Sequence, residues 1–283
     1  MDVAGLTIWQ FSLLAAGGAF LAGLLGALTG LGGGVVIVPL LTLVFGVDIR
    51  YAVGASLVAV IATSSGAAAA YVREGYTNIR LGLLLEVATT GGALTGAMLA
   101  IGTSANVIAV IFGLVLLFSA YFSIKGVPER PAEESPDRVA TWLALDSSYP
   151  TPEGRQTYRV RHVPAGFGLM YGAGVLSGLL GIGSGALKVL AMDRVMRIPF
   201  KASTTTSNFM IGVTAAASAG VYLHRGYLDP GLAMPVVLGV LAGATLGSRL
   251  LARGNVDILR LIFAVLVSAL ALQMIVNGLR GTF

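Results

Sequence analysis

The sequence contains no cysteine, two histidines and little charge. The lack of cysteine excludes disulfides, thiol catalysis and thiolate metal sites. His162 and His224 are too few and too far apart in the sequence for a histidine metal site, so we expect no cofactor. Charged residues make up 11% of the chain, against about a quarter in an average soluble domain, while hydrophobic residues make up 56%. A water-soluble fold with this composition could not cover its surface.

Charge is missing from several runs long enough to cross a bilayer. A run of about 18 or more uncharged, mostly apolar residues can span the hydrocarbon core. Four stretches between Asp2 and Asp48, Tyr51 and Val72, Val163 and Leu187, and Ala202 and Leu223 carry no charge. The sequence therefore predicts an all-α polytopic membrane protein, with further apolar segments at Leu81–Ala100, Val107–Ile124, Gly231–Ser248 and Leu261–Leu279.

The chain contains an internal repeat with an offset of 151 residues. Gly75-Tyr76 matches Gly226-Tyr227 at this offset, whereas Ala52–Ser56 corresponds to Ala202–Thr206 if one residue is gapped. The first apolar stretch has a counterpart in the second half and lacks a basic segment before it, so we expect it to be retained rather than cleaved as a signal peptide. The glycines that match are Gly23, Gly30, Gly32, Gly34, Gly92 and Gly96, with Gly174, Gly181, Gly183, Gly185, Gly243 and Gly247.

Each half contains five apolar segments, so the second half is expected to begin on the opposite side of the membrane. This predicts an inverted repeat, as in many secondary transporters. The second segment of each half, Val35–Phe45 and Ala186–Met196, has only about 11 residues. At about 1.5 Å per residue it covers roughly half of the hydrocarbon thickness, so it is either a half-helix or part of a re-entrant hairpin. The sequence thus allows six to ten full crossings.

The predicted organisation is a membrane repeat at 1–125, a polar linker at 126–163 and a second membrane repeat at 164–283. The linker is rich in proline, and its segment 157–161 alternates in a way that predicts a small hairpin with Thr141-Trp142-Leu143. Alternation of the segments across the bilayer places only Arg50, Arg225 and Arg280 on one side. By the positive-inside rule the other side is cytoplasmic and both termini are outside. The basic residues on that side are Arg73, Arg80, Lys125, Arg130, Arg138, Arg155, Arg159, Arg161, Arg194, Arg197, Lys201, Arg249 and Arg253.

Two glycine clusters interrupt apolar segments at equivalent places. Gly30-Leu31-Gly32-Gly33-Gly34 resembles a phosphate loop only superficially, because no Lys-Ser/Thr pair follows it. Unwound backbone at membrane depth must line a cavity or be buried in protein, and a helix that starts there directs its N–H groups toward an anion. The alternative is that the glycines only allow close helix packing. The predicted anion-site residues here are Gly32, Gly33, Gly34, Gly183, Ser184 and Gly185.

Two charged residues lie inside apolar segments and are functional candidates. Lys188 lies one turn into the second short segment, where the first half has Ile37, and is a candidate counter-charge for an anion. Its alternative is to extend to a nearby interface. Glu86 is the only acidic residue in the fourth segment. It is either a proton-coupling carboxylate or a structural partner of Lys188 or Arg80.

Hydroxyl-rich stretches begin the third segment of each half. The first includes Ser56, Thr63, Ser64 and Ser65, and the second runs from Ser203 to Asn208. Such donors could replace an anion's hydration shell, or they could bond back to helix carbonyls. The predicted binding residues from these stretches are Ser56, Thr204, Thr205, Ser207 and Asn208.

These paired motifs resemble the sulfite exporter TauE/SafE family of membrane permeases. The resemblance is carried by Gly30–Gly34 followed by Pro39, by Ala52–Leu57, by Gly181–Gly185 and by Ala202–Thr206. It covers nearly the whole chain apart from the linker. It implies transport of sulfur-containing anions such as sulfite or sulfonates like sulfoacetate, generally outward. Lys188 and the long linker depart from the family's usual pattern, so the substrate could differ from sulfite.

The leading hypothesis is a secondary transporter in the cell membrane that binds a small anion between its two halves. The alternatives are an anion channel on the same scaffold and a non-transporting membrane sensor. The chain has no cluster of residues typical of catalysis, so no enzymatic activity is expected. The basic residues form no patch with interleaved aromatics, so no nucleic acid partner is expected, whereas the small-residue faces allow a homodimer.

Overall fold

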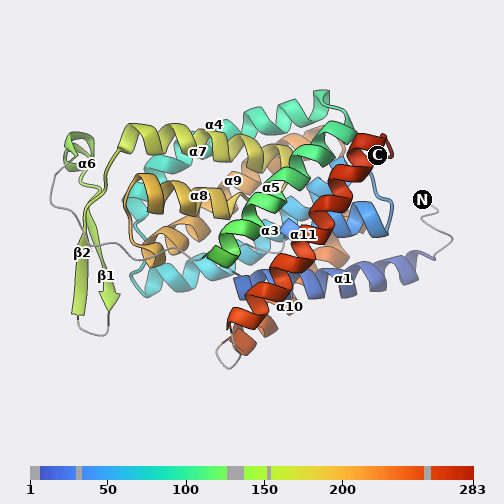
Figure 1. Cartoon of the computed structure of the whole chain (residues 1–283), viewed down its shortest axis with the longest axis horizontal. Helices are drawn as coiled ribbons and strands as arrows, with labels where there is room; N and C mark the ends of the chain where they lie inside the picture. The colour runs from blue at the N-terminus through green and yellow to red at the C-terminus, as the bar shows by residue number, and fades with distance from the viewer. Residues whose placement is uncertain (1–6, 30–33, 126–136, 152–153, 252–255) are drawn as a thin grey trace.

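A computed structural model describes residues 7–29, 34–125, 137–151, 154–251 and 256–283 as a helical bundle with one small hairpin (Figure 1). The first half comprises α1 (Ile8–Thr29), α2 (Gly34–Pro39) with a π-helical continuation (Leu40–Val44), α3 (Ile49–Arg73), α4 (Ile79–Gly102) and α5 (Ala105–Lys125). The linker holds α6 (Arg138–Trp142), β1 (Ser147–Thr151) and β2 (Gly154–Tyr158). The second half comprises α7 (Val163–Leu180), α8 (Gly185–Leu190) with a π-helical continuation (Ala191–Val195), α9 (Phe200–His224), α10 (Pro230–Leu251) and α11 (Val256–Arg280).

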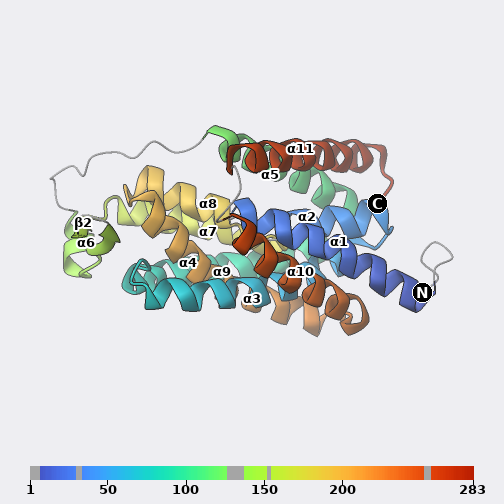
Figure 2. The ribbon, with the colours of Figure 1, turned by 90° about the horizontal axis from the view of Figure 1, so that it is seen from below.

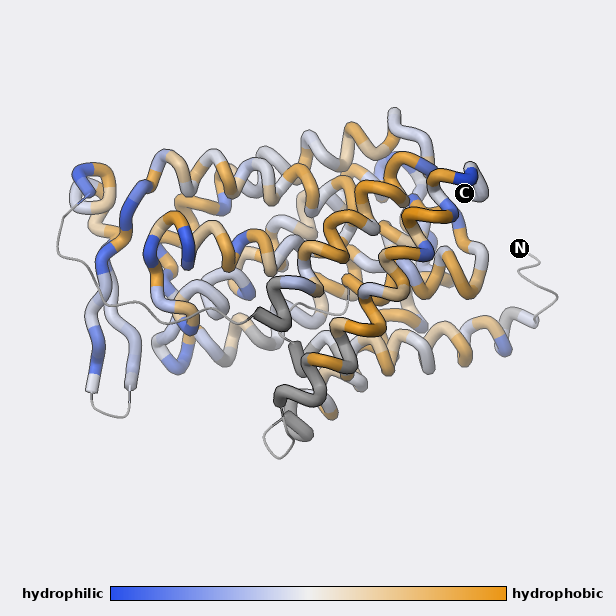
Figure 3. Tube along the Cα trace, viewed as in Figure 1, coloured by the Kyte–Doolittle hydropathy of each residue, from blue (hydrophilic) through white to orange (hydrophobic). Residues whose placement is uncertain are grey.

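The outer surface of the bundle is apolar, as expected for contact with lipid. Leu83, Met98, Leu114 and Leu272 are among many large hydrophobic side chains that are exposed. Figure 3 shows hydrophobic residues along most of the bundle, with hydrophilic residues concentrated around the hairpin. The predicted all-α polytopic membrane fold is confirmed. Four described helices are long and apolar enough to cross a membrane, namely Ile49–Arg73, Ile79–Gly102, Val163–Leu180 and Pro230–Gly247.

The helices repeat with the same offset as the glycines. α3 begins at Ile49 and α9 at Phe200, an offset of 151 residues, and both contain 25 residues. The short elements repeat in the same way, each with six α-helical and five π-helical residues, and they start within one residue of the predicted short segments. The one-residue gap predicted between Ala52–Ser56 and Ala202–Thr206 is therefore wrong. Because the helices are equal in length, Ser56 corresponds to Ser207.

Glycines let helices from opposite halves pack backbone to backbone. A Cβ atom at Gly23 in α1 would collide with the carbonyl oxygen of Val240 in α10. The equivalent Cβ at Gly174 in α7 would collide with the carbonyl oxygen of Thr89 in α4. The contact between α1 and α10 is thus repeated between α7 and α4 with the two halves exchanged. These glycines, which the sequence identified only as matches of the repeat, allow close packing of the helices.

The remaining equivalent helices pack directly against one another. In α3 and α9, Gly54 lies beside Tyr227 just beyond the end of α9, while Ser64 lies beside Gly212. In these contacts the residue number rises along α3 as it falls along α9, so the two helices are antiparallel. α5 and α11 are antiparallel in the same way: a Cβ at Gly113 would lie 2.6 Å from the carbonyl oxygen of Ala271, and one at Gly278 would lie 2.8 Å from that of Asn106.

The linker forms a hairpin, but not with the predicted partner. β1 and β2 are antiparallel, with Ser147 opposite Tyr158, whereas Thr141 and Trp142 belong to α6. Neighbouring strands close a much shorter loop than the predicted pair would, so their association costs less chain entropy. Asn78 fixes the hairpin to the bundle. Its Nδ2 donates to the carbonyl oxygen of Leu145 at 2.8 Å and to the hydroxyl of Tyr158 at 3.2 Å.

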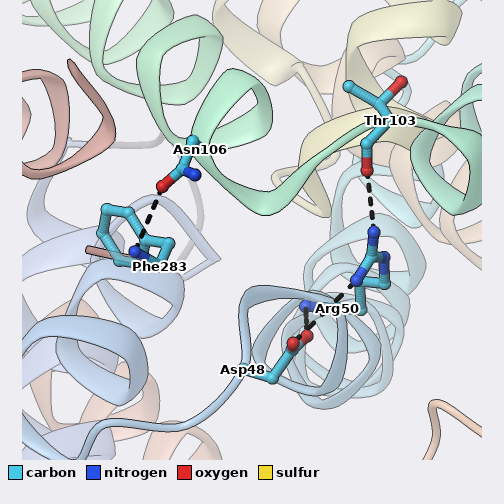
Figure 4. Close-up of polar contacts among 5 residues, drawn as sticks. All are labelled: Asp48, Arg50, Thr103, Asn106 and Phe283. Atoms are coloured by element: carbon cyan, nitrogen blue, oxygen red, sulfur yellow. Dashed lines mark hydrogen bonds and ion pairs between the residues drawn. The ribbon is translucent and has the colours of Figure 1, made fainter. Parts of the chain in front are cut away.

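The hairpin and the chain ends lie at opposite ends of the bundle. α1 begins and α11 ends at the end farthest from β1 and β2 (Figures 1 and 2). Polar contacts join the elements at this terminal end (Figure 4). Arg50 Nη2 donates to the carbonyl oxygen of Thr103 at 2.7 Å, and the backbone N–H of Phe283 donates to Asn106 Oδ1 at 3.1 Å. These bonds tie α3 to the α4–α5 connection and the C-terminus to α5.

Candidate functional site

The start of α2 and the break before α8 lie side by side between α3 and α9. In the second half the break has left-handed backbone at Gly181 (φ 70°), Gly183 (φ 68°) and Ser184 (φ 43°). A Cβ at Gly34, the first residue of α2, would lie 3.2 Å from the carbonyl oxygen of Gly181. Of the residues predicted at the two glycine clusters, Gly34, Gly183, Ser184 and Gly185 therefore lie in one region, whereas Gly32 and Gly33 lie outside the described residues.

Two equivalent serines anchor the first residue of each short helix. Ser56 in α3 lies with its hydroxyl 3.5 Å from the carbonyl oxygen of Gly34 and donates to that of Gly181 at 2.8 Å. Ser207 in α9 donates to the carbonyl oxygen of Gly185 at 3.3 Å. Both serines are buried. As placed, their hydroxyl protons are directed to the carbonyl oxygens of Gly181 and Gly185, so their observed role is to hold the backbone of the second break in place.

Lys188 lies in the interior of the bundle and does not extend to an interface. Its side chain is 0% exposed. Its Nζ donates to Thr214 Oγ1 in α9 at 2.6 Å. Thr214 Oγ1 in turn donates to Glu86 Oε1 in α4 at 2.7 Å. One threonine thus bridges a buried cation and a buried carboxylate that come from opposite halves of the chain.

Glu86 is held by hydroxyl groups and leaves one oxygen without a partner. It is 7% exposed, and Oε1 also accepts a hydrogen bond from Thr90 at 2.9 Å. Oε2 is buried and has no hydrogen-bond partner in the protein. Of the two partners that the sequence allowed, Lys188 interacts with it, whereas Arg80 donates to the carbonyl oxygen of Ala144 at 3.5 Å. A buried carboxylate with a free oxygen can accept a proton or a hydrogen-bond donor.

Ser184 supplies a second unsatisfied group close to Lys188 along the chain. Its hydroxyl is buried and has no hydrogen-bond partner in the protein. The backbone N–H of Lys188 donates to the Ser184 carbonyl oxygen at 3.1 Å, which places Ser184 at the start of α8 and Lys188 one helical turn further along the chain. The sequence prediction that Ser184 and Lys188 make this break different from the first is consistent with this arrangement.

The other predicted hydroxyls are not gathered around Lys188. Thr205 Oγ1 donates to the carbonyl oxygens of Lys201 and Ala202, and Asn208 Nδ2 to that of Thr204. Thr204 Oγ1 is buried without a partner. In the first half, Thr63, Ser64 and Ser65 all donate to carbonyl oxygens of their own helix. These groups mostly satisfy helix backbone, which is the alternative that the sequence left open.

Sequence reasoning missed the threonines that surround Glu86. Thr214 follows Ser207 by seven residues, which places both on one face of α9. Thr89 and Thr90 follow Glu86 by three and four residues, within one turn of α4. These spacings could have identified them. Within the described residues, no group of three or more acidic or histidine side chains is placed to hold a metal ion.

Comparison with known proteins agrees with the geometry. The family model "Sulfite exporter TauE/SafE" matches residues 15–274. Three relatives are each named a probable membrane transporter protein. YunE of Bacillus subtilis is 26% identical to this chain, over 92% of this chain and 95% of its own length. YdhB of the same organism is 26% identical, over 81% of this chain and 86% of its own length. A protein of Xylella fastidiosa strain 9a5c is 25% identical, over 94% of this chain and 95% of its own length. No solved structure matches the chain significantly. The family and these names indicate a transporter rather than an enzyme, and the chain belongs to the sulfite exporter TauE/SafE family of membrane transporters.

Proposed function

We propose that this protein is a secondary transporter that exports small sulfur-containing anions, such as sulfite or organosulfonates like sulfoacetate, through a site between its two halves. The substrate class comes from the name of the family. The site is the region around the second break, where Ser184 and Lys188 lie. The transporter works by alternating access, opening this site to one side of the membrane at a time.

The observation that carries the proposal is the complete burial of Lys188. A cation inside a membrane protein is costly and is retained where it binds or moves a charge. Lys188 has three N–H donors, and its side chain is 0% exposed. An anionic substrate that enters this region finds an ammonium group and the free hydroxyl of Ser184. Because the surroundings are largely apolar, their attraction for an anion is stronger than it would be in water.

The arrangement of the two halves supports alternating access. Equivalent helices α3 and α9 pack antiparallel, as do α5 and α11, and the α1–α10 contact is exchanged with the α7–α4 contact. Such contacts are expected from two inverted halves related by an approximate two-fold axis. In this proposal the site around Lys188 lies between the halves, since Lys188 and Thr214 belong to the second half and Glu86 to the first. Rocking one half against the other would therefore expose it alternately to each side.

We further propose that the protein is a multi-pass protein of the cell membrane, with both termini outside and the linker in the cytoplasm. The hairpin and the chain ends lie at opposite ends of the bundle (Figure 1). The linker carries Arg138, Arg155, Arg159 and Arg161, an excess of basic residues that favours the cytoplasmic side. In this orientation an interior-negative potential favours anion efflux by about 2.3 kcal/mol per charge per 100 mV.

Proteoliposome transport tests this proposal. Labelled sulfite, sulfoacetate, sulfate and thiosulfate are offered to vesicles containing the wild type or Lys188→Ala, with empty vesicles as the control. We expect at least one sulfur anion to move well above the empty-vesicle level, and the Lys188→Ala variant to lose most of that flux. If none of the four anions moves in the wild type, the substrate class is wrong. Unchanged flux in Lys188→Ala would remove Lys188 from the site.

The same vesicles distinguish a carrier from a channel. A carrier saturates with substrate and shows counterflow, in which unlabelled anion inside drives uptake of labelled anion from outside. A channel instead gives a high unitary conductance in a planar bilayer. We expect saturation and counterflow because Lys188 is fully buried and does not line an open pore.

A further inference from the structure

We propose that Glu86 and the transported anion alternate as the partner of Lys188, so that each anion is carried together with one proton bound to Glu86. This inference rests on the proposed function and adds the coupling ion to it. It makes Glu86 the proton-binding group, Thr214 the link between proton and anion, and Lys188 the group that both negative charges share.

The geometry provides one cation for two negative charges. Lys188 and Glu86 are joined only through Thr214 Oγ1, at 2.6 Å from Lys188 Nζ and 2.7 Å from Glu86 Oε1. Nζ has three donors, of which one is directed at Thr214. A small anion can therefore reach Lys188 without first displacing a direct contact with the carboxylate. Thr214 links the two groups, because its hydroxyl oxygen accepts the hydrogen bond from Lys188 while its hydroxyl proton is donated to Glu86.

Charge balance requires the proton. Without substrate, the ammonium and the carboxylate together are neutral. A monoanion bound to Lys188 adds a negative charge to a region in which the ammonium is 0% and the carboxylate 7% exposed. An uncompensated charge at such depth is strongly unfavourable. Transfer of one proton from the aqueous side to the Glu86 carboxylate, with formation of one O–H bond, restores neutrality for a monoanion and halves the excess charge for a dianion, and it involves no oxidation or reduction.

The free polar atoms have the chemistry that this exchange needs. Glu86 Oε2 has no partner in the protein and is available to accept the proton, while Oε1 keeps its bond from Thr90. Ser184 Oγ, also buried and without a partner, is available to donate to the anion. Glu86 Oε2 is thus an acceptor that the proton would satisfy, and Ser184 Oγ a donor that the anion would satisfy.

Among the described residues, Lys188 is the charged group that acts on Glu86. Of the elements packed against α4, α7 carries no acidic or basic residue, and its Tyr171 bonds to Thr95. The titratable cationic residues of α3 and α9 lie near the helix ends, at Arg50, Arg73, Lys201 and His224. Tyr222 of α9 donates a hydrogen bond to the backbone carbonyl oxygen of Gly178. The α3 tyrosines, Tyr51 and Tyr71, also lie toward the ends of that helix.

Coupling has a consequence for the direction of transport. A monoanion that leaves with a proton carries no net charge, so its export follows the concentration and pH gradients. A dianion that leaves with one proton still carries one negative charge outward, which an interior-negative potential favours. Coupling of this kind is therefore compatible with export and makes it sensitive to pH.

The test uses proteoliposomes held at zero membrane potential with potassium and valinomycin. Labelled sulfoacetate is the probe because its carboxylate and sulfonate are both ionised near neutral pH. With the outside one pH unit more acidic, one proton per anion predicts accumulation inside the vesicles of about tenfold. Counterflow without any pH gradient is measured in parallel, because it reports binding and movement independently of coupling.

The variants separate the two roles. Glu86→Gln mimics the protonated carboxyl group, so we expect counterflow to persist within about threefold while accumulation driven by pH disappears. Lys188→Gln is expected to lose both. Val237→Gln, at the position of α10 equivalent to Glu86, is the matched control and should keep both.

Two results would overturn the coupling. If the wild type shows counterflow but no accumulation at zero potential, or if Glu86→Gln still accumulates sulfoacetate, the proton is not carried on Glu86 and the transport function stands. If Glu86→Gln does not fold, a pH-sensitive dye inside wild-type vesicles decides the question by recording whether protons enter with sulfoacetate. Absence of counterflow in the wild type overturns both the transport of this probe and the coupling.

Discussion

The two equivalent interior positions of the molecule differ in charge. In the second short helix, Lys188 interacts through Thr214 with Glu86 of α4. At the offset of 151 residues, the corresponding residues are Ile37, Thr63 and Val237. Ile37 is fully buried and Val237 partly buried among hydrophobic residues. The scaffold of glycines and helices is thus duplicated, while the ionic group exists once.

The two threonines show how the charged position arises from the common scaffold. Thr63 donates to the carbonyl oxygen of Ala59 at 3.0 Å, and Thr214 lies 3.0 Å from the equivalent carbonyl oxygen of Met210. Thr214 additionally contacts Lys188 and Glu86. A residue that satisfies its own helix in one half therefore acts as a bridge in the other. A single asymmetric site requires only that two apolar positions carry opposite charges.

The largest predicted effect on stability comes from replacing Lys188 by an apolar residue while Glu86 is kept. Lys188→Ile leaves Glu86 buried without its counter-charge and should destabilise the protein by about 3–5 kcal/mol. The double variant Lys188→Ile/Glu86→Val places at each position the apolar residue of its equivalent, Ile37 or Val237, and should recover most of that loss, because a buried ion pair replaced by apolar residues is often near neutral. Thermal unfolding in detergent measures both. A double variant as unstable as the single one would show that the pair is not the cause.

The second prediction compares the two threonines. Thr214→Val removes the bridge between two charged groups and should cost about 1.5–3 kcal/mol, the range for hydrogen bonds to charged groups. Thr63→Val removes only a bond to its own helix and should change stability by less than about 0.5 kcal/mol. The same unfolding measurement applies. Equal losses in the two variants would contradict the difference between the two positions.

The third prediction concerns the part of the scaffold that is shared. Gly23→Ala and Gly174→Ala each force a Cβ into a backbone carbonyl of the neighbouring helix and should each cost about 1–3 kcal/mol, by similar amounts in the two halves. Gly17→Ala and Gly168→Ala are matched controls, since nothing lies within 4 Å of the added atom at either position. Loss of stability in only one half would show that the packing is not equivalent.

The smallest predicted effect is at the two equivalent serines. Ser56→Ala and Ser207→Ala each remove one hydroxyl bond to backbone and should cost about 0.5–1.5 kcal/mol. Ser56 donates to the carbonyl oxygen of Gly181 just before α8, and Ser207 to that of Gly185 at its first residue, so both variants act on the second break. Hydrogen–deuterium exchange at the first residues of α8 should therefore rise in both variants. Unchanged exchange there in Ser56→Ala would contradict the bond to Gly181.

Much of the fold follows from the sequence because membrane segments and glycines leave strong patterns. Uncharged runs predict the helices, and the repeated glycines predict the offset and the two short segments. The alignment of α3 with α9 in the repeat is harder to predict from the sequence, because hydroxyl and small residues match equally well with a gap at Ala52–Ser56. The linker hairpin is predicted in kind but with the wrong partner, because strand alternation alone does not choose between Thr141–Leu143 and Ser147–Thr151.

The site is predicted only in part. Lys188, Glu86 and Ser184 are identifiable because charge or polarity within an apolar segment is costly and rare. Thr214 is not, since it is one of many hydroxyls on α9 and its importance comes from the packing of α9 against α4 and α8. Thr205 and Asn208 are equally prominent in the sequence, yet they bond to their own helix.

The most direct test of the account is counterflow of a labelled sulfur anion by the double variant Lys188→Ile/Glu86→Val, which replaces each charged residue by its apolar equivalent from the opposite half. The account predicts a protein that folds with nearly wild-type stability and shows no counterflow above empty vesicles. A folded double variant that exchanges the anion at the wild-type rate would contradict the claim that the single charged position forms the binding site.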